Sequence, residues 1–286
     1  MGIDALLLLL TFALGVALAR VSLCAVAALQ QLIHARQYDG LVRLLLATSG
    51  AGVTLLLLAG LAPGQVLLPA DIATRTGAIA GGLLLGLGAL INGGCYLGSV
   101  LYLGSGNLNF LLTLVGIASG EYLSNLATGM ALPPGANLRM SMGAAWIAGA
   151  AGFILIILVL LFRARSRERW LASGAGLLAG LVYARHPGWS YGTVLDSIAR
   201  GNFVRMNWIM NLAALLLFAG AVSGALLAGR FQLQWPTAAR SLRCLAGGAI
   251  MGAGAARVPG GNDLLWLFYF DRWNCDAVPR PAHASR

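Results

Sequence analysis

Long apolar runs, separated by short polar breaks, make up most of the chain. A helix needs about 20 predominantly apolar residues to cross the hydrocarbon core of a bilayer. Four runs are long enough to cross alone, namely residues 44–62, 108–126, 143–162 and 206–228. Four shorter runs cover residues 5–19, 76–91, 171–184 and 244–256. This pattern predicts an all-α integral membrane protein with eight transmembrane helices, or nine if residues 264–270 also cross.

Each shorter run ends in a polar or glycine-rich break, and a short apolar piece follows the break. The breaks lie at residues 20–24, 92–95, 185–188 and 257–262. The pieces that follow, such as residues 25–33 and 96–103, are too short to cross a bilayer. Irregular backbone is tolerated at membrane depth only where it is buried in protein or lines a cavity. We therefore expect these pieces to be re-entrant half-helices.

Parts of the sequence recur at a nearly constant shift. Residues 80–89 align without gaps to 246–255 at a shift of 166, and residues 15–20 align to 180–185 at a shift of 165. Five crossings would precede the second copy, so the two copies would be inverted. We expect two inverted repeats, at 1–142 and 170–272. A helix and an arginine-rich loop at 143–169 would connect them, and a polar tail at 273–286 would follow. In transporters, paired short segments interrupted by Gly or Pro point to the substrate site.

Composition excludes a soluble domain. Hydrophobic residues make up 59% of the chain, charged residues only 10%, and the mean hydropathy is +0.81. A soluble domain spends about a quarter of its residues on charge. The net charge of +10 comes from arginines spread between the apolar runs, which suits membrane flanks and not a nucleic-acid surface. We expect no nucleic-acid partner, and the four cysteines have neither zinc-site nor disulfide-framework spacing.

The breaks contain the residue types that an anion site needs. A half-helix that begins inside the membrane points its unpaired N–H groups and its positive dipole end into a cavity. Glycine lets the backbone approach a ligand closely, and a thiol is a weak donor and soft acceptor that suits a sulfur-bearing anion. The candidate substrate-binding residues are Arg20, Cys24, Asn92, Gly93, Gly94, Cys95, Gly260, Gly261 and Asn262.

Structural explanations remain open for the same residues. A buried free cysteine often serves as a small packing residue, and Arg20 can extend its side chain to the membrane interface. Asn92 and Asn262 flank the glycine loops and can cap a helix instead of lining a cavity. Cys244 lies inside an apolar run and is expected to pack there, and Cys275 lies in the tail with no assigned role.

At these positions the chain resembles the YeeE/YedE membrane proteins, also described as sulfur-transport proteins. The motifs that carry the resemblance are Arg20-Val-Ser-Leu-Cys24, Gly86-Leu-Gly88-Ala-Leu-Ile-Asn-Gly93-Gly94-Cys95-Tyr-Leu-Gly98 and Gly252-Ala-Gly254-Ala-Ala-Arg-Val-Pro259-Gly260-Gly261-Asn262-Asp263. The resemblance implies thiosulfate or related uptake through a pseudo-symmetric bundle with a narrow waist. It implies that Cys24 and Cys95 are two of the waist cysteines that pass the anion along. The sequence departs from the family at Gly261, where Cys95 has its repeat partner.

The leading hypothesis is a permease for a small sulfur-containing anion. The alternatives are a permease for another solute (a selenium species, sulfite or a polysulfide), a membrane-embedded sulfur-transfer or redox enzyme, and a scaffold subunit of a sulfur-handling complex. No Walker A motif, CxxC pair or metal-ligand cluster is visible, so we expect a protein that is not an enzyme and holds no cofactor. The expected partners are the anion, the lipid bilayer and, as a further candidate, a soluble sulfur-carrier protein.

Orientation follows from the distribution of arginine. The face with the loops after the first, third, fifth and seventh spans carries ten arginines and two acidic residues, against nine and seven on the other face. The cluster at Arg163, Arg165, Arg167 and Arg169 lies in a short loop, where the positive-inside rule is most reliable. We therefore expect a multi-pass protein of the bacterial cytoplasmic (inner) membrane, with this loop inside and a retained N-terminal span that starts outside.

A cysteine introduced at Ser166 tests this orientation. In intact cells it should resist a membrane-impermeant thiol reagent, and it should react once the cells are permeabilised. Labelling from outside would reverse the assigned topology.

Overall fold

The computed structural model describes residues 2–61, 75–128, 154, 156–158, 166–186, 189–200 and 208–257. The long helices are α1 (Gly2–Val21), α3 (Asp39–Leu61), α4 (Arg75–Asn92), α6 (Asn109–Thr128), α8 (Arg167–Arg185), α10 (Trp208–Leu227) and α11 (Ala238–Ala255). The short helices are α2 (Ala25–Ala35), α5 (Tyr96–Gly104) and α9 (Tyr191–Ala199). The described ranges contain one isolated β-bridge and no strand, so the predicted all-α class is confirmed for them.

Five stretches of the described chain are long and apolar enough to cross a membrane. They are Ala5–Ala35, Asp39–Leu58, Ile79–Gly104, Asn109–Ala127 and Trp208–Leu227. The protein is therefore a multi-pass membrane protein. Most of the expected span at 143–162, the segment at 264–270 and the tail at 273–286 lie outside the described residues. The total of eight or nine crossings stays a prediction.

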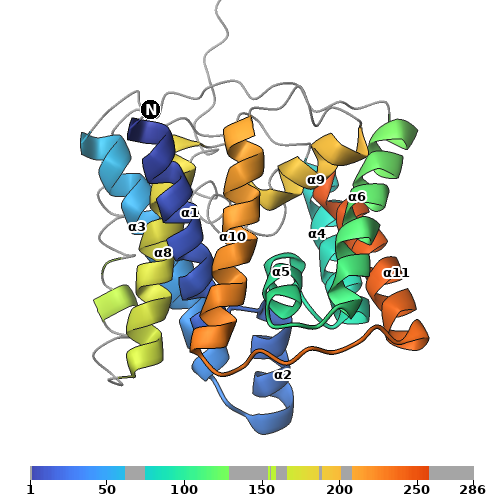
Figure 1. Ribbon diagram of the computed structural model, residues 1–286, viewed down its shortest axis with the longest axis horizontal. Coiled ribbons are helices and arrows are strands. Elements are labelled where there is room, and N and C mark those ends of the chain that lie inside the picture. Colours follow the sequence, from blue (N-terminus) through green and yellow to red (C-terminus); the bar gives the residue numbers. More distant parts are fainter. Residues whose placement is uncertain are drawn as a thin grey trace, which may run out of the picture.

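The long helices run side by side, with α5 between them at the centre (Figure 1). Helix α1 packs along α10, α3 packs along α8, and α11 packs against both α4 and α6. The two predicted half-helices after the first and second short runs are present as α2 and α5. Of the two, α5 lies inside the bundle, and α2 lies near its lower end (Figure 1).

Glycines at the crossings let the long helices approach to backbone contact. A Cβ atom added at Gly88 of α4 would lie 2.6 Å from both the carbonyl O of Gly247 and the amide N of Met251 in α11. Gly50 of α3 faces α8 in a similar way, with a Cβ position 2.7 Å from the Ser173 carbonyl O. In a bilayer the hydrophobic effect does not drive helices together, because the lipid tails are as apolar as the helix surfaces. Close packing at small residues therefore becomes important for helix association.

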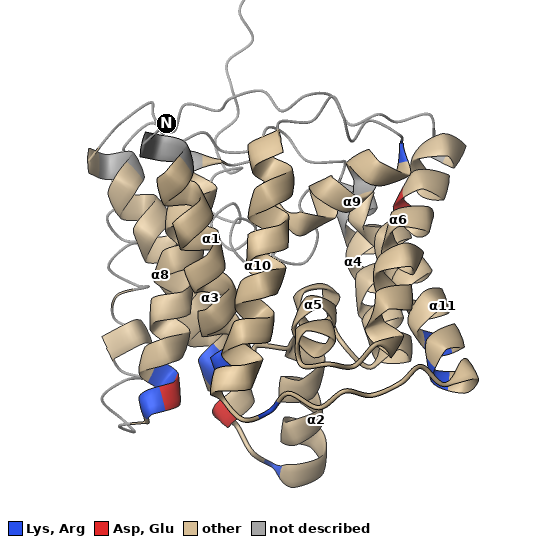
Figure 2. Cartoon of the chain, in the orientation of Figure 1, with Lys and Arg blue, Asp and Glu red and all other residues tan. Residues whose placement is uncertain are grey.

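Most of the charged residues that the structure describes gather at the lower face, where α1 and α10 end and α3, α8 and α11 begin (Figure 2). Two ion pairs tie α3 to α8 there: Arg43 with Glu168, and Arg169 with Asp39 at 2.7 Å. The loops expected after the first, third, fifth and seventh spans meet at this face. The segment after α10 crosses beneath α5 and pairs with the loop that follows α5 through the Asn107–Gln234 bridge.

Gly88 and Gly86 in α4 provide a matched pair for testing the packing. Nothing lies within 4 Å of a Cβ atom at Gly86, whereas one at Gly88 would meet the α11 backbone. Gly88→Ala should destabilise the protein by about 1–3 kcal/mol because two backbones must separate. Gly86→Ala should be neutral or slightly stabilising. Thermal unfolding of the purified variants in detergent measures both, and equal effects would contradict the α4–α11 contact.

Candidate functional site

The break after α4 is a tight turn that leads directly into α5. Gly93 adopts a left-handed φ of 73°, which favours glycine. The amides of Gly93 and Gly94 both donate to the carbonyl of Ala89, at 2.9 and 3.2 Å, and so end α4. Cys95 follows as the N-cap residue of α5. These two glycine amides are occupied within the turn, so the N–H groups available to an anion would belong to the first turn of α5.

Asn92 holds this turn in place from the inside. Its Nδ2 donates to the Gly94 carbonyl at 2.8 Å and to Ser99 Oγ at 2.9 Å, and its Oδ1 accepts from Thr113 Oγ1 at 2.7 Å. The side chain is fully buried. Asn92 therefore links the ends of α4, α5 and α6, and its polar atoms are used within the protein.

The break after α1 leads into α2 in a comparable way. Ser22 turns the chain with a left-handed φ of 53°, and Cys24 becomes the N-cap residue of α2 in an extended conformation. The carbonyl of Cys24 accepts the first helical hydrogen bond, from the amide of Ala28 at 2.9 Å. Both cysteines of the candidate site thus occupy the same position, immediately before a short helix.

The structure brings these two cysteines into contact. Their side chains lie within hydrogen-bonding reach of each other, and both are buried free thiols. A Cβ atom added at Gly98 would lie 2.6 Å from Cys24 Sγ and 3.2 Å from Cys95 Sγ, so only glycine fits beside the pair. Cys95 Sγ also accepts from the amide of Gly98 at 3.2 Å. The partial positive ends of α2 and α5 therefore converge on two adjacent sulfur atoms.

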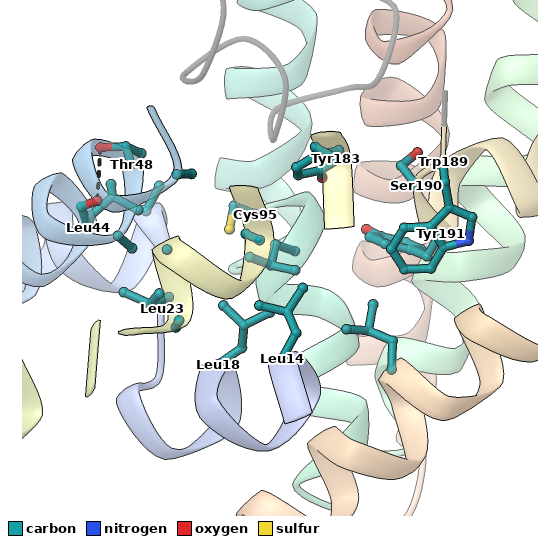
Figure 3. A pocket seen from close by; sticks show the side chains of 18 residues that line it. Leu14, Leu18, Leu23, Leu44, Thr48, Cys95, Tyr183, Trp189, Ser190 and Tyr191 are labelled. Carbon is teal, nitrogen blue, oxygen red and sulfur yellow. Dashed lines mark hydrogen bonds between the residues drawn. The ribbon is translucent and has the colours of Figure 1, made fainter. Parts of the chain in front are cut away.

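Two cavities lie next to the cysteine pair, and each is lined by one of the two cysteines. The lower cavity, of about 390 Å³, has Cys24, Gly98 and Tyr102 in its lining and extends to Arg43 and Arg230 near the lower face. The upper cavity, of about 110 Å³, is lined by Cys95 and by an aromatic group that includes Tyr183, Trp189 and Tyr191 (Figure 3). The rest of its lining is mostly leucine and alanine. Cys24 lines only the lower cavity and Cys95 only the upper one.

The other predicted site residues lie around this pair or outside the described chain. Arg20 lines neither cavity, and its backbone carbonyl accepts from Arg230. Asn92, Gly93 and Gly94 shape the turn without lining either cavity. Gly94 packs under aromatic rings, since an added Cβ would lie 3.1 Å from both Tyr102 and Phe110. The three predicted residues Gly260, Gly261 and Asn262 lie outside the described residues.

Several residues that line the cavities were not predicted from the sequence. Ser190 lines the upper cavity, and its Oγ accepts from the amide of Thr193 at 3.2 Å at the start of α9. The repeat offers a signal for it, because Ser190 lies 166 residues after Cys24. Tyr102 lines the lower cavity together with Cys24, but its position in an apolar stretch gave no signal.

Fold and site together define a multi-pass helical membrane protein whose two internal cavities meet at a buried pair of thiols. The model of a protein family described as sulphur transport matches residues 20–175, which is just over half of the chain. The chain therefore belongs to the sulphur transport family, and the resemblance noted from its motifs is confirmed. No curated protein matches the chain. The family points to a transporter of sulfur compounds and not to an enzyme.

Replacing Asn92 should loosen the turn that positions Cys95. Asn92→Leu leaves the partners at Gly94, Ser99 and Thr113 without their hydrogen bonds, so we expect a loss of about 2 kcal/mol or more in stability. Ser119→Ala provides the control, because Ser119 bonds only within its own helix, to the Gly116 carbonyl. Thermal unfolding in detergent should separate the two variants by several degrees. If Asn92→Leu unfolds like the wild type, the turn does not depend on this side chain.

Proposed function

We propose that the protein carries a small sulfur-containing anion, thiosulfate in the first instance, across the membrane past the Cys24–Cys95 pair. The observation that carries the proposal is the position of this pair, at the meeting point of two short helices and between two cavities. A solute that moved between the cavities would pass the two thiols. Membership of the sulphur transport family supports a sulfur compound as that solute.

The chemistry of the constriction suits an anion that contains sulfur. Unpaired N–H groups at a helix N-terminus, together with the helix dipole, stabilise negative charge. Cys24 is the N-cap residue of α2, so the first turn of α2 begins next to the thiol pair. A thiol donates weakly and its sulfur is polarisable, so its contact with the anion is easily exchanged. Weak contacts at a narrow point favour transit over tight binding.

Reciprocal packing supports the predicted inverted repeats. Gly88 of α4 meets Gly247 and Met251 of α11, while Gly254 of α11 meets Gly81 and Leu85 of α4. Each residue of one contact lies 166 positions from its counterpart in the other. The pairs α1–α10 and α8–α3 correspond in the same way. We take the repeats to be 1–142 and 170–272, so that the cysteine pair lies near the axis that relates them.

The proposed location is the bacterial cytoplasmic membrane, with the lower, arginine-rich face inside and the N-terminus outside. The arrangement of α1, α3, α8 and α10 puts the predicted cytoplasmic loops on a single face, as this topology requires (Figure 2). The lower cavity would then open toward the cytoplasm and the upper one toward the outside. A soluble sulfur carrier would meet the protein at the lower face.

Transport should depend on both thiols. Cys24→Ala and Cys95→Ala each remove a weak donor from a desolvated constriction, at a cost of about 1 kcal/mol, which slows transit several-fold. Cys95→Ser keeps a donor but substitutes a hard oxygen, so we expect a reduction no greater than that of Cys95→Ala. Uptake of radiolabelled thiosulfate into liposomes, per inserted protein, measures the effect. Growth on thiosulfate as the sole sulfur source provides a cellular readout.

Cys244→Ala is the matched control. Cys244 is fully buried in α11, packs with Leu103 and Phe110, and lines neither cavity. Its removal should cost some stability but leave uptake per inserted molecule unchanged. Unchanged uptake in a Cys24→Ala, Cys95→Ala double variant would refute the role of the thiols. Uptake of sulfite, a polysulfide or a selenium species in place of thiosulfate would reassign the substrate.

A further inference from the structure

The two cavities differ sharply in charge. The upper cavity is lined by apolar and aromatic side chains with few polar groups. The lower cavity, in contrast, is lined by two arginines, Arg43 and Arg230. It is also lined by the uncharged polar residues Ser22, Gln31, Ser105 and Gln232. None of the described residues that line it is acidic. A solute that enters the lower cavity therefore meets a cationic wall before it reaches Cys24.

Each of these arginines is held by a defined partner. Arg43 lies in the first turns of α3 and pairs with Glu168 at the start of α8. Arg230 follows α10 and donates to Ser22 Oγ and to the carbonyl of Arg20. The two guanidinium groups thus come from separate elements. A planar guanidinium has five N–H donors, so these contacts leave further donors for a ligand.

The partner carboxylate only partly offsets the charge of Arg43. The Arg43 side chain is 15% exposed, whereas that of Glu168 is 58% exposed, so the carboxylate is the more solvated of the two. Solvent screens an exposed charge more strongly than a buried one. The elements that meet at this face also contribute Arg20, Arg36, Arg167, Arg169, Arg240 and Arg243 against Asp39 and Glu168 alone among the described residues. The cavity therefore opens on a positive surface.

Tyr102 connects the arginines with the thiol pair. It lines the lower cavity together with Cys24. Its ring stacks on Phe110 at a centroid distance of 4.9 Å, and the guanidinium of Arg240 lies 5.5 Å from the centre of the Phe110 ring. This stack holds the phenol ring in place, so Tyr102 contributes a positioned side chain to the same cavity wall as Cys24.

We propose that the lower cavity is an oxyanion-binding subsite, in which Arg43 and Arg230 hold a small divalent sulfur oxyanion and Tyr102 orients it next to Cys24. The proposal rests on the proposed function for the identity of the sulfur ligand. Guanidinium groups match the oxygen atoms of an oxyanion through charge-assisted hydrogen bonds, which are stronger than neutral ones. The subsite would retain the anion on one side of the constriction, where the thiols alone offer only weak contacts.

The first experiment measures the electric field at Cys24 without using any transported solute. Purified full-length protein, in nanodiscs of phosphatidylcholine, is treated with an anionic or a cationic methanethiosulfonate of similar size. Mass spectrometry of the Cys24 peptide gives both labelling rates. Their ratio cancels the intrinsic reactivity of the thiol. We expect the anionic reagent to react faster, and the preference should weaken at high ionic strength.

Matched variants assign that field to the two arginines. Arg43→Gln and Arg230→Gln should each reduce the anionic preference several-fold, and the double variant should bring the two rates close together. Arg243→Gln removes the same charge from an exposed position outside the cavity, so it should have little effect. Glu168→Gln should increase the preference, because it frees Arg43 from its carboxylate partner. A structural defect would not produce opposite changes in Arg43→Gln and Glu168→Gln.

The second experiment measures equilibrium binding of radiolabelled thiosulfate to the same proteins. Arg43→Gln and Arg230→Gln should weaken binding roughly tenfold each, the range expected when a charge-assisted hydrogen bond is lost. Glu168→Gln should strengthen binding, and Arg243→Gln should not change it. Repeating both measurements with phosphatidylglycerol in the nanodiscs tests for a lipid headgroup. If the lipid abolishes the preference and the binding, the cavity holds a headgroup and the proposal is wrong.

The outcomes separate this proposal from the proposed function. An anionic preference that persists in the double variant would overturn the subsite even if liposomes take up thiosulfate. A lost preference with unchanged thiosulfate affinity would also overturn it, because the arginines would then create a field without holding the anion. Arginine-dependent preference and binding, without any uptake into liposomes, would uphold the subsite and refute transport.

Discussion

A helix that breaks inside an apolar molecule leaves backbone N–H and C=O groups that must find partners within the protein, and the whole site depends on how this requirement is met. At the end of α4 the requirement is met by the Ala89 carbonyl and by the buried side chain of Asn92. At the start of α5 it is met in part by Cys95 Sγ. The groups left over lie in the first turns of the short helices, which face the cavities.

Close packing of the long helices makes room for this arrangement. Glycines bring α4 against α11 and α3 against α8 to backbone contact, whereas the two cavities lie where the short helices meet the long ones. Gly98 allows equally close packing at the centre, because any side chain at this position would collide with both sulfur atoms. The thiol pair is therefore part of the packing, and each of its members also lines one of the two cavities. Both explanations offered for Cys24 and Cys95, packing and contact with a ligand, are compatible with this geometry.

The two sides of the barrier have different physical roles. The upper cavity is small and apolar, which disfavours retention of a charged solute. The lower cavity is larger and carries the guanidinium groups of Arg43 and Arg230. An anion that passed from the upper to the lower side would move toward more favourable electrostatics.

The sequence by itself determined the class of protein, the positions of the breaks and the sulfur-transport family. The class follows from hydropathy, the breaks follow from glycines and polar residues between apolar runs, and the family follows from contiguous motifs. The lengths of α2 and α5 follow from the same local signals. Contacts between distant segments were decided only by the tertiary structure. It brought the free thiols of Cys24 and Cys95 next to each other, placed Asn92 inside a hydrogen-bond network with Thr113, and brought Arg43 and Arg230 to one cavity. Hydropathy reports how deeply a residue is buried but not which neighbour it meets, since many helix rotations bury the same apolar surface.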